Sequence, residues 1–483
     1  MRTHRQPPGR LGTDRTAGSP DDGGPRRFER PAPRLPRRVP AWALSASLGG
    51  FAVGYNAGVI AGALLSVRGD LALTALEEGA LASVLPLGAM VGGIVAGRIA
   101  DGLGRRIALV TAAGLFIATG ALAALAPGYA VLLVARVAAG LAVGVTSSVV
   151  PIYLSEIAPA GVRGRLVTMN QLMVTIGILV SYGAGLAFEG VGGWRAMFAV
   201  GIAPAGAMLV GMLRAPETPV WLVQRGHDDR AREVLTGVAG SHEGQRMVDG
   251  LSRAGRGARQ FGARELLRSS ARPALAIGVT LAVLQQLSGI NTIVYYGPTI
   301  MQRTGFSASN SMVSAIVIGA INVAATVVSF RLVDRLGRRP LLLGSLAGML
   351  VSLVLLGISL EIPLGSAGSW LALLCIVGYI AAFAVGMGPV FWLLIAEIFP
   401  PRARAGGASI ATAVNWFSNF AVGLAFLPLA GAIGQAPTFW LFAAACAAGL
   451  LFVERRVPET KGRDITAAGG EPGSPGGAAA PVG

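Results

Sequence analysis

The sequence contains few of the residues that build metal sites and enzyme active sites. It has two cysteines and three histidines among 483 residues. Cys375 and Cys446 each lie alone in apolar surroundings, so neither a disulfide nor a metal site is expected. His4, His227 and His242 fall in the N-terminal tail or in a long hydrophilic segment. With no metal-ligand cluster, nucleophile motif or phosphate-binding loop, the sequence disfavours an enzyme and predicts no cofactor.

Charged residues are also scarce. They make up 13% of the chain, against 53% hydrophobic residues, and the mean hydropathy is +0.62. This composition is typical of a polytopic membrane protein, because about 20 apolar residues are needed for each helix that crosses the hydrocarbon core. The sequence therefore predicts an all-α membrane protein with twelve transmembrane helices, near 42–65, 78–98, 107–126, 130–152, 168–188, 195–213, 274–302, 311–333, 340–361, 370–395, 405–430 and 436–453.

The basic residues predict the orientation. If the N-terminus is cytoplasmic, most Lys and Arg fall in cytoplasmic segments, with Arg68, Arg136, Arg195 and Arg303 as exceptions. The positive-inside rule then places both termini in the cytoplasm and the protein in the plasma (inner) membrane. The net charge of +16 fits basic flanks beside an anionic leaflet, so no nucleic-acid partner is expected.

The predicted spans divide the chain into two halves. Residues 1–40 are rich in Arg, Pro and Gly, which predicts a disordered cytoplasmic tail without a cleavable signal peptide. Six spans occupy residues 41–213, a cytoplasmic linker covers 214–273, and six more spans occupy 274–455. A second cytoplasmic tail follows at 456–483.

The two halves repeat each other in sequence. DGLGRR at 101–106 reappears as DRLGRR at 334–339, and SEIAPAGVRG at 155–164 reappears as AEIFPPRARA at 396–405. Two related six-helix bundles can rock about a site at their interface, which is the basis of alternating access. The duplication therefore favours a transporter.

The repeated motifs carry charges at the predicted cytoplasmic helix ends. We expect these charges to pair when the cytoplasmic side closes, and so to form a gate; the alternative is that they only set the topology. The predicted gate consists of Arg98, Asp101, Arg105, Glu156, Arg163, Glu217, Asp334, Arg338, Glu397, Arg404 and Glu459.

The stretch QQLSGIN at 285–291 places amides inside an apolar span. In an unbroken helix Gln286 and Asn291 would point about 140° apart, at 100° per residue. Ser288-Gly289 offers a place for the helix to unwind, and Pro298 predicts a further break. Unwound backbone at membrane depth is tolerated where it lines a watery cavity. Amides that line such a cavity would suit hydroxyl groups, although they could instead only bond neighbouring helices.

Other spans add uncharged polar groups. No acid lies among them to pair with a cationic substrate, so the set favours a neutral monosaccharide or polyol. These groups are Asn170, Gln171, Asn322, Trp392, Asn415, Trp416 and Asn419.

With these motifs the chain resembles the sugar porter family of the major facilitator superfamily. The resemblance covers residues 42–465 and includes GRIADGLGRR, PIYLSEIAPAGVRG, PETPVWL, QQLSGINTIVYYGP, GMGPVFW, NWFSNF and VPETKG. It implies the major facilitator fold, with two six-helix bundles and short cytoplasmic helices in the central loop. It also implies a sugar site lined by Gln171, Gln285, Gln286, Asn291, Asn322 and Trp392, with Asn415 and Trp416 as further candidates.

Asn56 bears on energy coupling. Proton-coupled members of the family usually carry Asp at this position, beside the arginine that corresponds to Arg136. An amide does not titrate, so the sequence favours a facilitated-diffusion uniporter that functions as a monomer in the lipid bilayer. The alternatives are a proton-coupled sugar or polyol symporter, a non-transporting sugar sensor and a drug-efflux antiporter.

Overall fold

The computed structural model describes residues 38–158, 163–189, 193–239, 241–254, 271–362, 365–400 and 403–460. The two predicted tails lie outside these ranges, apart from residues 38–40 and 456–460. Throughout the described ranges the regular structure is helical, without a strand.

Twelve helical segments are long and apolar enough to cross a membrane, which confirms the predicted spans. The first five spans are α1 (Arg38–Asp70), α2 (Ala75–Leu103), α3 (Arg105–Ala124), α4 (Tyr129–Ile157) and α5 (Arg163–Ala187). The eighth, ninth, eleventh and twelfth are α14 (Ala308–Leu336), α15 (Arg338–Glu361), α18 (Arg404–Ile433) and α19 (Gln435–Arg456). The sixth, seventh and tenth spans are helix pairs: α6 (Gly193–Val200) with α7 (Ile202–Arg214), α12 (Arg272–Leu287) with α13 (Ile290–Arg303), and α16 (Ser366–Val385) with α17 (Met387–Glu397).

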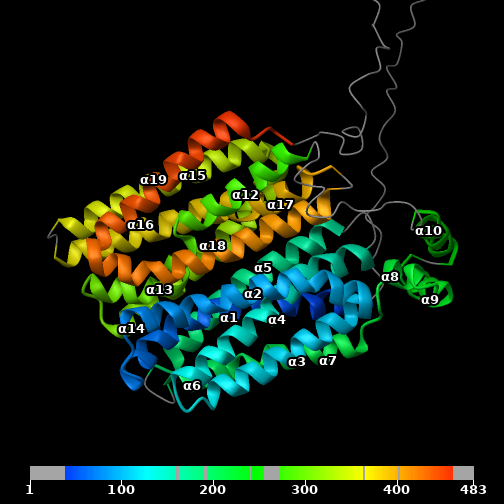
Figure 1. The fold of residues 1–483 in the computed structure, drawn as a ribbon, viewed down its shortest axis with the longest axis horizontal. Coiled ribbons are helices and arrows are strands. Elements are labelled where there is room, and N and C mark those ends of the chain that lie inside the picture. The colour runs from blue at the N-terminus through cyan, green and yellow to red at the C-terminus, as the bar shows by residue number, and fades with distance from the viewer. Residues whose placement is uncertain are drawn as a thin grey trace, which may run out of the picture. The chain divides into compact units, whose positions relative to one another are not determined.

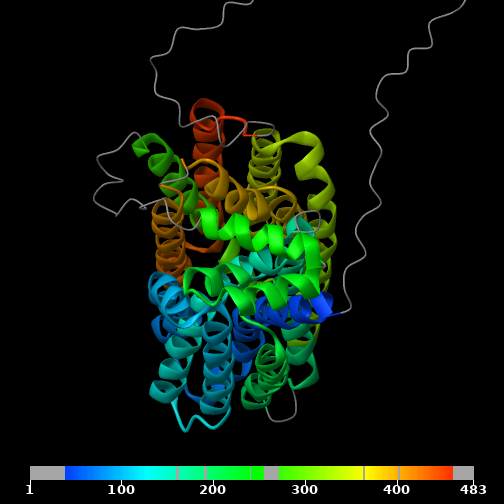
Figure 2. The same cartoon turned by 90° about the vertical axis from the view of Figure 1, so that its right-hand side faces the viewer.

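The spans form two six-helix bundles, one from α1 to α7 and one from α12 to α19. Figures 1 and 2 show the blue-to-teal helices of the first bundle beside the light-green-to-red helices of the second. Within the first bundle, glycines allow close contact between backbones. A Cβ at Gly88 of α2 would collide with the backbone of α4 at Val137, and a Cβ at Gly140 would collide with Leu85 in return. Such small-residue contacts are the usual basis of helix packing in lipid.

The described part of the central segment, up to residue 254, forms three short helices, α8 (Pro219–Gln224), α9 (Asp228–Ala239) and α10 (Ser241–Ala254). They share a small apolar core of Leu222, Ala231, Leu235 and Val248. Figure 1 shows them at one end of the bundles, which we call the linker end; the opposite end, near α6, we call the far end. The helical linker implied by the family resemblance is therefore present.

The two bundles contact each other mainly toward the far end. Gly79, in the first turn of α2, lies against Leu424 near the end of α18, and Gly185 of α5 lies against Met312 of α14. The Ser309 hydroxyl of the second bundle donates a hydrogen bond to the Glu189 carboxylate of the first, at 3.1 Å. These contacts close the space between the bundles at this end.

Pro298 does not break its helix, so that prediction is wrong. Helix α13 continues through Pro298 to Arg303. A proline in a helix leaves the carbonyl four residues earlier without its usual donor. Here that carbonyl, of Val294, accepts a hydrogen bond from the Tyr182 hydroxyl of α5 at 3.0 Å. The group released by the proline thus becomes a link between the bundles.

Candidate functional site

The seventh span unwinds where the sequence predicted. Helix α12 ends at Leu287 and α13 begins at Ile290, with Ser288 and Gly289 between them. Gly289 has φ 85° and ψ 15°, a left-handed conformation that favours glycine. A Cβ at this position would also collide with the Phe442 ring of α19. Both the backbone conformation and the packing therefore require glycine here.

The unwound turn brings four of the predicted amides into one hydrogen-bonded cluster. The Asn291 amide donates to Gln286 Oε1 at 2.7 Å, and the Gln286 amide donates to Asn415 Oδ1 of α18 at 3.1 Å. The Asn415 amide in turn donates to Gln285 Oε1 at 2.7 Å. We call Gln285, Gln286, Asn291 and Asn415 the amide cluster.

The members of the amide cluster differ in their remaining hydrogen-bonding capacity. Gln285 uses its amide on the Met387 carbonyl at 3.0 Å, and both N–H groups of Asn415 are taken by Gln285 and the Ala282 carbonyl. Asn291 is half-buried and uses only one N–H group within the described residues. Its second N–H and its carbonyl oxygen can each bond a hydroxyl. Asn291 is therefore the most available member for a ligand.

The polar row continues along α13. The Tyr295 hydroxyl donates to Asn419 Oδ1 at 3.3 Å, and the Tyr296 hydroxyl donates to the Gly423 carbonyl at 3.1 Å. Both acceptors lie on α18. Helices α13 and α18 thus face each other with hydrogen-bonding groups over several turns.

Four other predicted contact residues lie outside the amide cluster. Gln171 and Asn322 are half-buried, and their side chains form no hydrogen bond within the described ranges. Trp392 is 37% exposed and packs edge-to-face on Phe391, with ring centroids 5.0 Å apart. Trp416 reaches from the second bundle into an apolar cluster of the first, and its buried indole N–H has no partner in the described part of the chain.

A second polar feature lies inside the first bundle, around Arg136 of α4. This side chain is 1% exposed, and its Nη1 donates to the backbone carbonyl of Asn56 at 2.8 Å. Its Nε and Nη2 have no hydrogen-bond partner among the described residues. The Asn56 amide is turned to its own helix and donates to the Ala52 carbonyl at 2.9 Å. The arginine thus lies beside residue 56, but bonds its backbone rather than its side chain.

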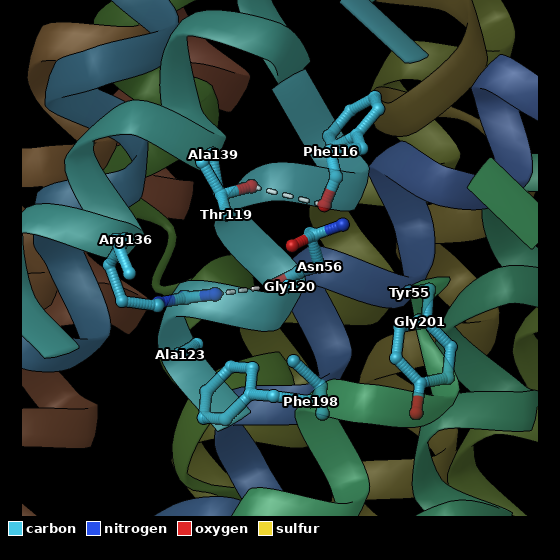
Figure 3. A pocket seen from close by; sticks show the side chains of 12 residues that line it. Tyr55, Asn56, Phe116, Thr119, Gly120, Ala123, Arg136, Ala139, Phe198 and Gly201 are labelled. Atoms are coloured by element: carbon cyan, nitrogen blue, oxygen red, sulfur yellow. Dashed lines mark hydrogen bonds between the residues drawn. The ribbon is translucent and has the colours of Figure 1, made fainter. Parts of the chain in front are cut away.

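The unpaired side of Arg136 faces a small cavity (Figure 3). Its volume is about 10 Å³, roughly the space that one water molecule needs. Figure 3 shows Phe198 beside the guanidinium group and Phe116 on the other side of the cavity, beyond Thr119. The Phe198 ring centroid lies 6.0 Å from the guanidinium carbon. No Asp or Glu occurs among the described residues that line the cavity. The positive charge therefore has a carbonyl and an aromatic ring nearby, but no carboxylate.

At the linker end of the first bundle, the predicted gate charges form a compact cluster. Arg105 lies 3.2 Å from both Glu156 and Asp101. Glu217, at the start of the linker, accepts hydrogen bonds from the backbone N–H groups of Arg105 and Arg106 at 3.0 Å each. Backbone donors at the start of a helix favour a carboxylate, so Glu217 caps α3.

The second bundle repeats this cluster. Arg338 lies 2.8 Å from Glu397, and Glu459 accepts from the backbone N–H groups of Arg338 and Arg339 at 3.0 Å each. These ion pairs join residues within one bundle, not across the two. Arg98 is exposed and has no ion pair within the described ranges. The side chains of Arg163, Asp334 and Arg404 lie outside the described residues.

Comparison with known proteins assigns the family. Residues 42–468 match a family model described as sugar (and other) transporter. The chain belongs to this family. It is 39% identical over 420 residues to a putative metabolite transport protein of Bacillus subtilis, covering 87% of this chain and 92% of that protein. It is 37% identical over 419 residues to a galactose-proton symporter of Escherichia coli, covering 86% and 90%.

The fold is also that of a solved family member. The xylose transporter of E. coli, in a partially occluded inward-open conformation, matches with a TM-score of 0.78 and 29% identity, over 88% of this chain and 99% of that chain. The protein is thus a sugar transporter of the major facilitator type with twelve membrane-spanning helices, and not an enzyme.

One polar feature of the transporter is not among the residues that the sequence analysis singled out. Glu78, in the first turn of α2, is only 5% exposed and forms an ion pair with Arg68 of α1 at 3.0 Å. Arg303 of α13 lies within electrostatic reach. The only signal in the sequence was that Glu78 and the two outlying arginines all fall near span ends on the same side.

Proposed function

We propose that this transporter carries a neutral monosaccharide or polyol by facilitated diffusion. The observation that carries the proposal is the amide cluster, in which uncharged donors and acceptors from three helices meet at a helix break. Such groups match sugar hydroxyls, which both donate and accept hydrogen bonds. Gln171, Asn322 and Trp392 complete the proposed set from α5, α14 and α17, and Trp416 adds a further group from α18.

Transport would follow alternating access. The far end is closed by direct contacts between the bundles, such as the bond from Ser309 to Glu189. We assign the linker end and both termini to the cytoplasm of a plasma-membrane protein that functions as a monomer. We assign the present conformation as inward-facing. In it Arg105 and Arg338 pair with glutamates of their own bundles. We expect them to approach across the bundles when the cytoplasmic side closes.

The proposal of uniport rests on the surroundings of Arg136. A proton gradient acts on a conformational equilibrium only through a group that binds a proton differently in the two states. Asn56 does not titrate, and the described lining of the Arg136 cavity contains no acid. Proton symport is the second candidate, favoured by the 37% identity to a galactose-proton symporter.

A substrate panel in proteoliposomes tests both candidates. Labelled D-glucose, D-galactose, D-xylose and myo-inositol are offered with and without an inward proton gradient. A uniporter equilibrates one or more of them, and the gradient changes the plateau little. Uphill accumulation that collapses on addition of a protonophore would establish symport instead.

A substitution in the amide cluster tests the site. Gln286→Ala removes one acceptor of the Asn291 amide and both donors to Asn415 and Gln285. Losing at least two hydrogen bonds, whether to the sugar or within the cluster, weakens sugar binding about tenfold or more, since each bond contributes about 1 kcal/mol. The measurement is the apparent KM of the sugar selected by the panel, alongside the melting temperature of the purified variant. Unchanged kinetics in a folded variant would make this amide structural.

A further inference from the structure

The second bundle contains a second helix break, which the sequence analysis did not predict. The tenth span is interrupted at Gly386, with φ −127° and ψ −78°, between α16 and α17. A Cβ at Gly386 would collide with the Leu341 carbonyl of α15, so α15 packs directly on the break. Each break releases backbone groups from helical hydrogen bonds. At membrane depth such groups are costly unless another part of the protein bonds them.

At the first break, Tyr379 of α16 bonds the released backbone. Its hydroxyl donates to the Ser288 carbonyl at 2.8 Å and lies 3.3 Å from the Ser288 hydroxyl oxygen. The Ser288 hydroxyl in turn donates to the Gln285 carbonyl at 2.6 Å. Tyr379 is fully buried, so no bulk water competes for these bonds. One tyrosine thus holds the turn that separates Gln286 from Asn291.

At the second break, both backbone polar groups of Met387 form hydrogen bonds. Its backbone N–H donates to the Ser345 hydroxyl of α15 at 3.0 Å, and its carbonyl accepts from the Gln285 amide at 3.0 Å. Gln285 belongs to the amide cluster and precedes the first break by three residues. The two breaks are therefore joined by a continuous chain of hydrogen bonds through Tyr379, Ser288, Gln285, Met387 and Ser345, which we call the break junction.

We propose that Tyr379 and Ser345 are positioning residues for the amide cluster. Neither belongs to the cluster. Tyr379 acts through Ser288 to fix the left-handed turn at Gly289, and Ser345 acts through Met387 to fix Gln285. In an unbroken helix Gln286 and Asn291 would point about 140° apart, so their contact depends on the geometry of this turn. The effect on sugar rests on the proposed function, whereas the effect on the backbone does not.

Tyr379→Phe is the first test, because it removes one hydroxyl and keeps the ring and its packing. In the full-length protein in proteoliposomes, counterflow of labelled D-glucose should show an apparent KM raised about fivefold, as expected for one lost hydrogen bond of typical strength. The maximal rate should stay within a factor of two. A KM effect of this kind separates a positioning role from a loss of folded protein, which lowers only the maximal rate.

A second measurement needs no sugar. Hydrogen–deuterium exchange of the purified variant should speed up at residues 286–291, and Ser345→Ala should do the same at residues 386–390. Exchange in α4 should stay unchanged. Tyr153→Phe is the matched control, since Tyr153 is equally buried and its hydroxyl bonds one carbonyl, of Pro216 at 3.0 Å in the first bundle. It should leave exchange at both breaks and the KM unchanged.

The double variant Tyr379→Phe with Ser345→Ala tests whether the two residues act on one geometry. If they do, the fold increase in the KM of the double variant is clearly smaller than the product of the fold increases in the two single variants, because the effects of coupled sites are not additive. Independent, multiplying effects would contradict the junction, as would unchanged exchange at residues 286–291 in Tyr379→Phe. If exchange responds but the unmodified protein moves none of the sugars, the junction stands and the proposed function fails.

Discussion

The linker ends of the two bundles are almost the same, whereas their interiors differ. In the first bundle the Arg105 N–H lies 3.0 Å from Glu217, and in the second the Arg338 N–H lies 3.0 Å from Glu459. The neighbouring threonines repeat as well, since the Thr218 hydroxyl donates to Glu156 and the Thr460 hydroxyl donates to Glu397, both at 2.6 Å. The duplicated motifs therefore preserve one local structure in both halves.

The middles of the bundles have diverged. In the first bundle α1 and α4 run without a break, and the polar centre is one buried charge, Arg136. In the second bundle the seventh and tenth spans are both interrupted, and the polar centre is a set of uncharged amides. Under the proposed function, the repeated ends would move with each bundle, and the uncharged amides of the second bundle would bind the substrate.

The largest expected effect comes from giving the first bundle an acid. In Asn56→Asp the side chain no longer donates to the Ala52 carbonyl, and repulsion between the two oxygens turns it toward the unpaired Nε and Nη2 of Arg136. A proton would then have a binding site in the first bundle. We expect uphill sugar accumulation of up to about tenfold per unit of pH gradient, since one unit corresponds to about 1.4 kcal/mol.

Uptake by the Asn56→Asp variant with and without a protonophore measures this effect, and the unmodified protein is the control. Equilibration without accumulation in a folded, active variant would show that the acid alone does not create coupling.

The next effect concerns the helix break at Ser288-Gly289. This break lies in the first span of the second bundle, whereas the first span of the first bundle, α1, is continuous. Gly289→Ala places a side chain at φ 85° and against the Phe442 ring, which we expect to destabilise the protein by about 1–3 kcal/mol and to disturb the amide cluster. Gly297→Ala is the matched control on α13, because nothing lies within 4 Å of its added Cβ. Thermal unfolding of both variants in detergent gives the comparison; equal melting temperatures would contradict a special role for Gly289.

The two breaks also show how far the sequence could predict the structure. The break at Ser288-Gly289 was predictable, because flanking amides had to converge and glycine offered a turn. The break at Gly386 was missed although Gly386, Gly388 and Pro389 stand together, because no amides flank it and the sequence analysis relied on that polar contrast. Pro298 was misread for a related reason. The partner of the carbonyl it releases, Tyr182, comes from the other bundle, and no local pattern in the sequence reveals that contact.

The spans and the repeated charges were predictable because composition and spacing determine them. The partners of those charges were not. Within the described residues Arg105 and Arg338 pair inside their own bundles, which depends on the tight reversals at Gly104 and Gly337, with φ 103° and 95°. The four-residue amide cluster likewise required the tertiary position of α18, which supplies Asn415.

A smaller effect, which should be equal in the two bundles, is expected from neutralising one gate glutamate in each. Glu156→Gln and Glu397→Gln each remove one carboxylate charge from a largely buried ion pair, with side chains 14% and 15% exposed. We expect each to destabilise the folded protein by about 1 kcal/mol, and both variants to slow transport to the same extent. Melting temperature and the maximal rate of counterflow are the measurements. A strong effect in one bundle and none in the other would show that the geometric repeat hides a functional asymmetry.

The smallest expected effect lies at the far end, where the first bundle presents Glu78 to the second. Its carboxylate is paired with Arg68, and Arg303 of the other bundle lies within electrostatic reach. The adjacent Gly79 contacts Leu424, so separating the bundles would expose this region to water. Glu78→Gln removes the attraction to Arg303 and should favour opening at this end by a factor of about two to five, as for a partly exposed ion pair.

The opening can be followed through Ser83, which is fully buried against Gly423 of the second bundle. In a Ser83→Cys background, labelling by a membrane-impermeant maleimide reports how often the far end opens, because the native Cys375 and Cys446 are buried. Glu77→Gln is the control, since within the described residues the half-buried Glu77 side chain bonds only Thr74 of its own bundle. If both variants label at the rate of the parent, Glu78 does not help to hold the bundles together, and the closure depends on packing and on the bonds of Tyr182 and Ser309.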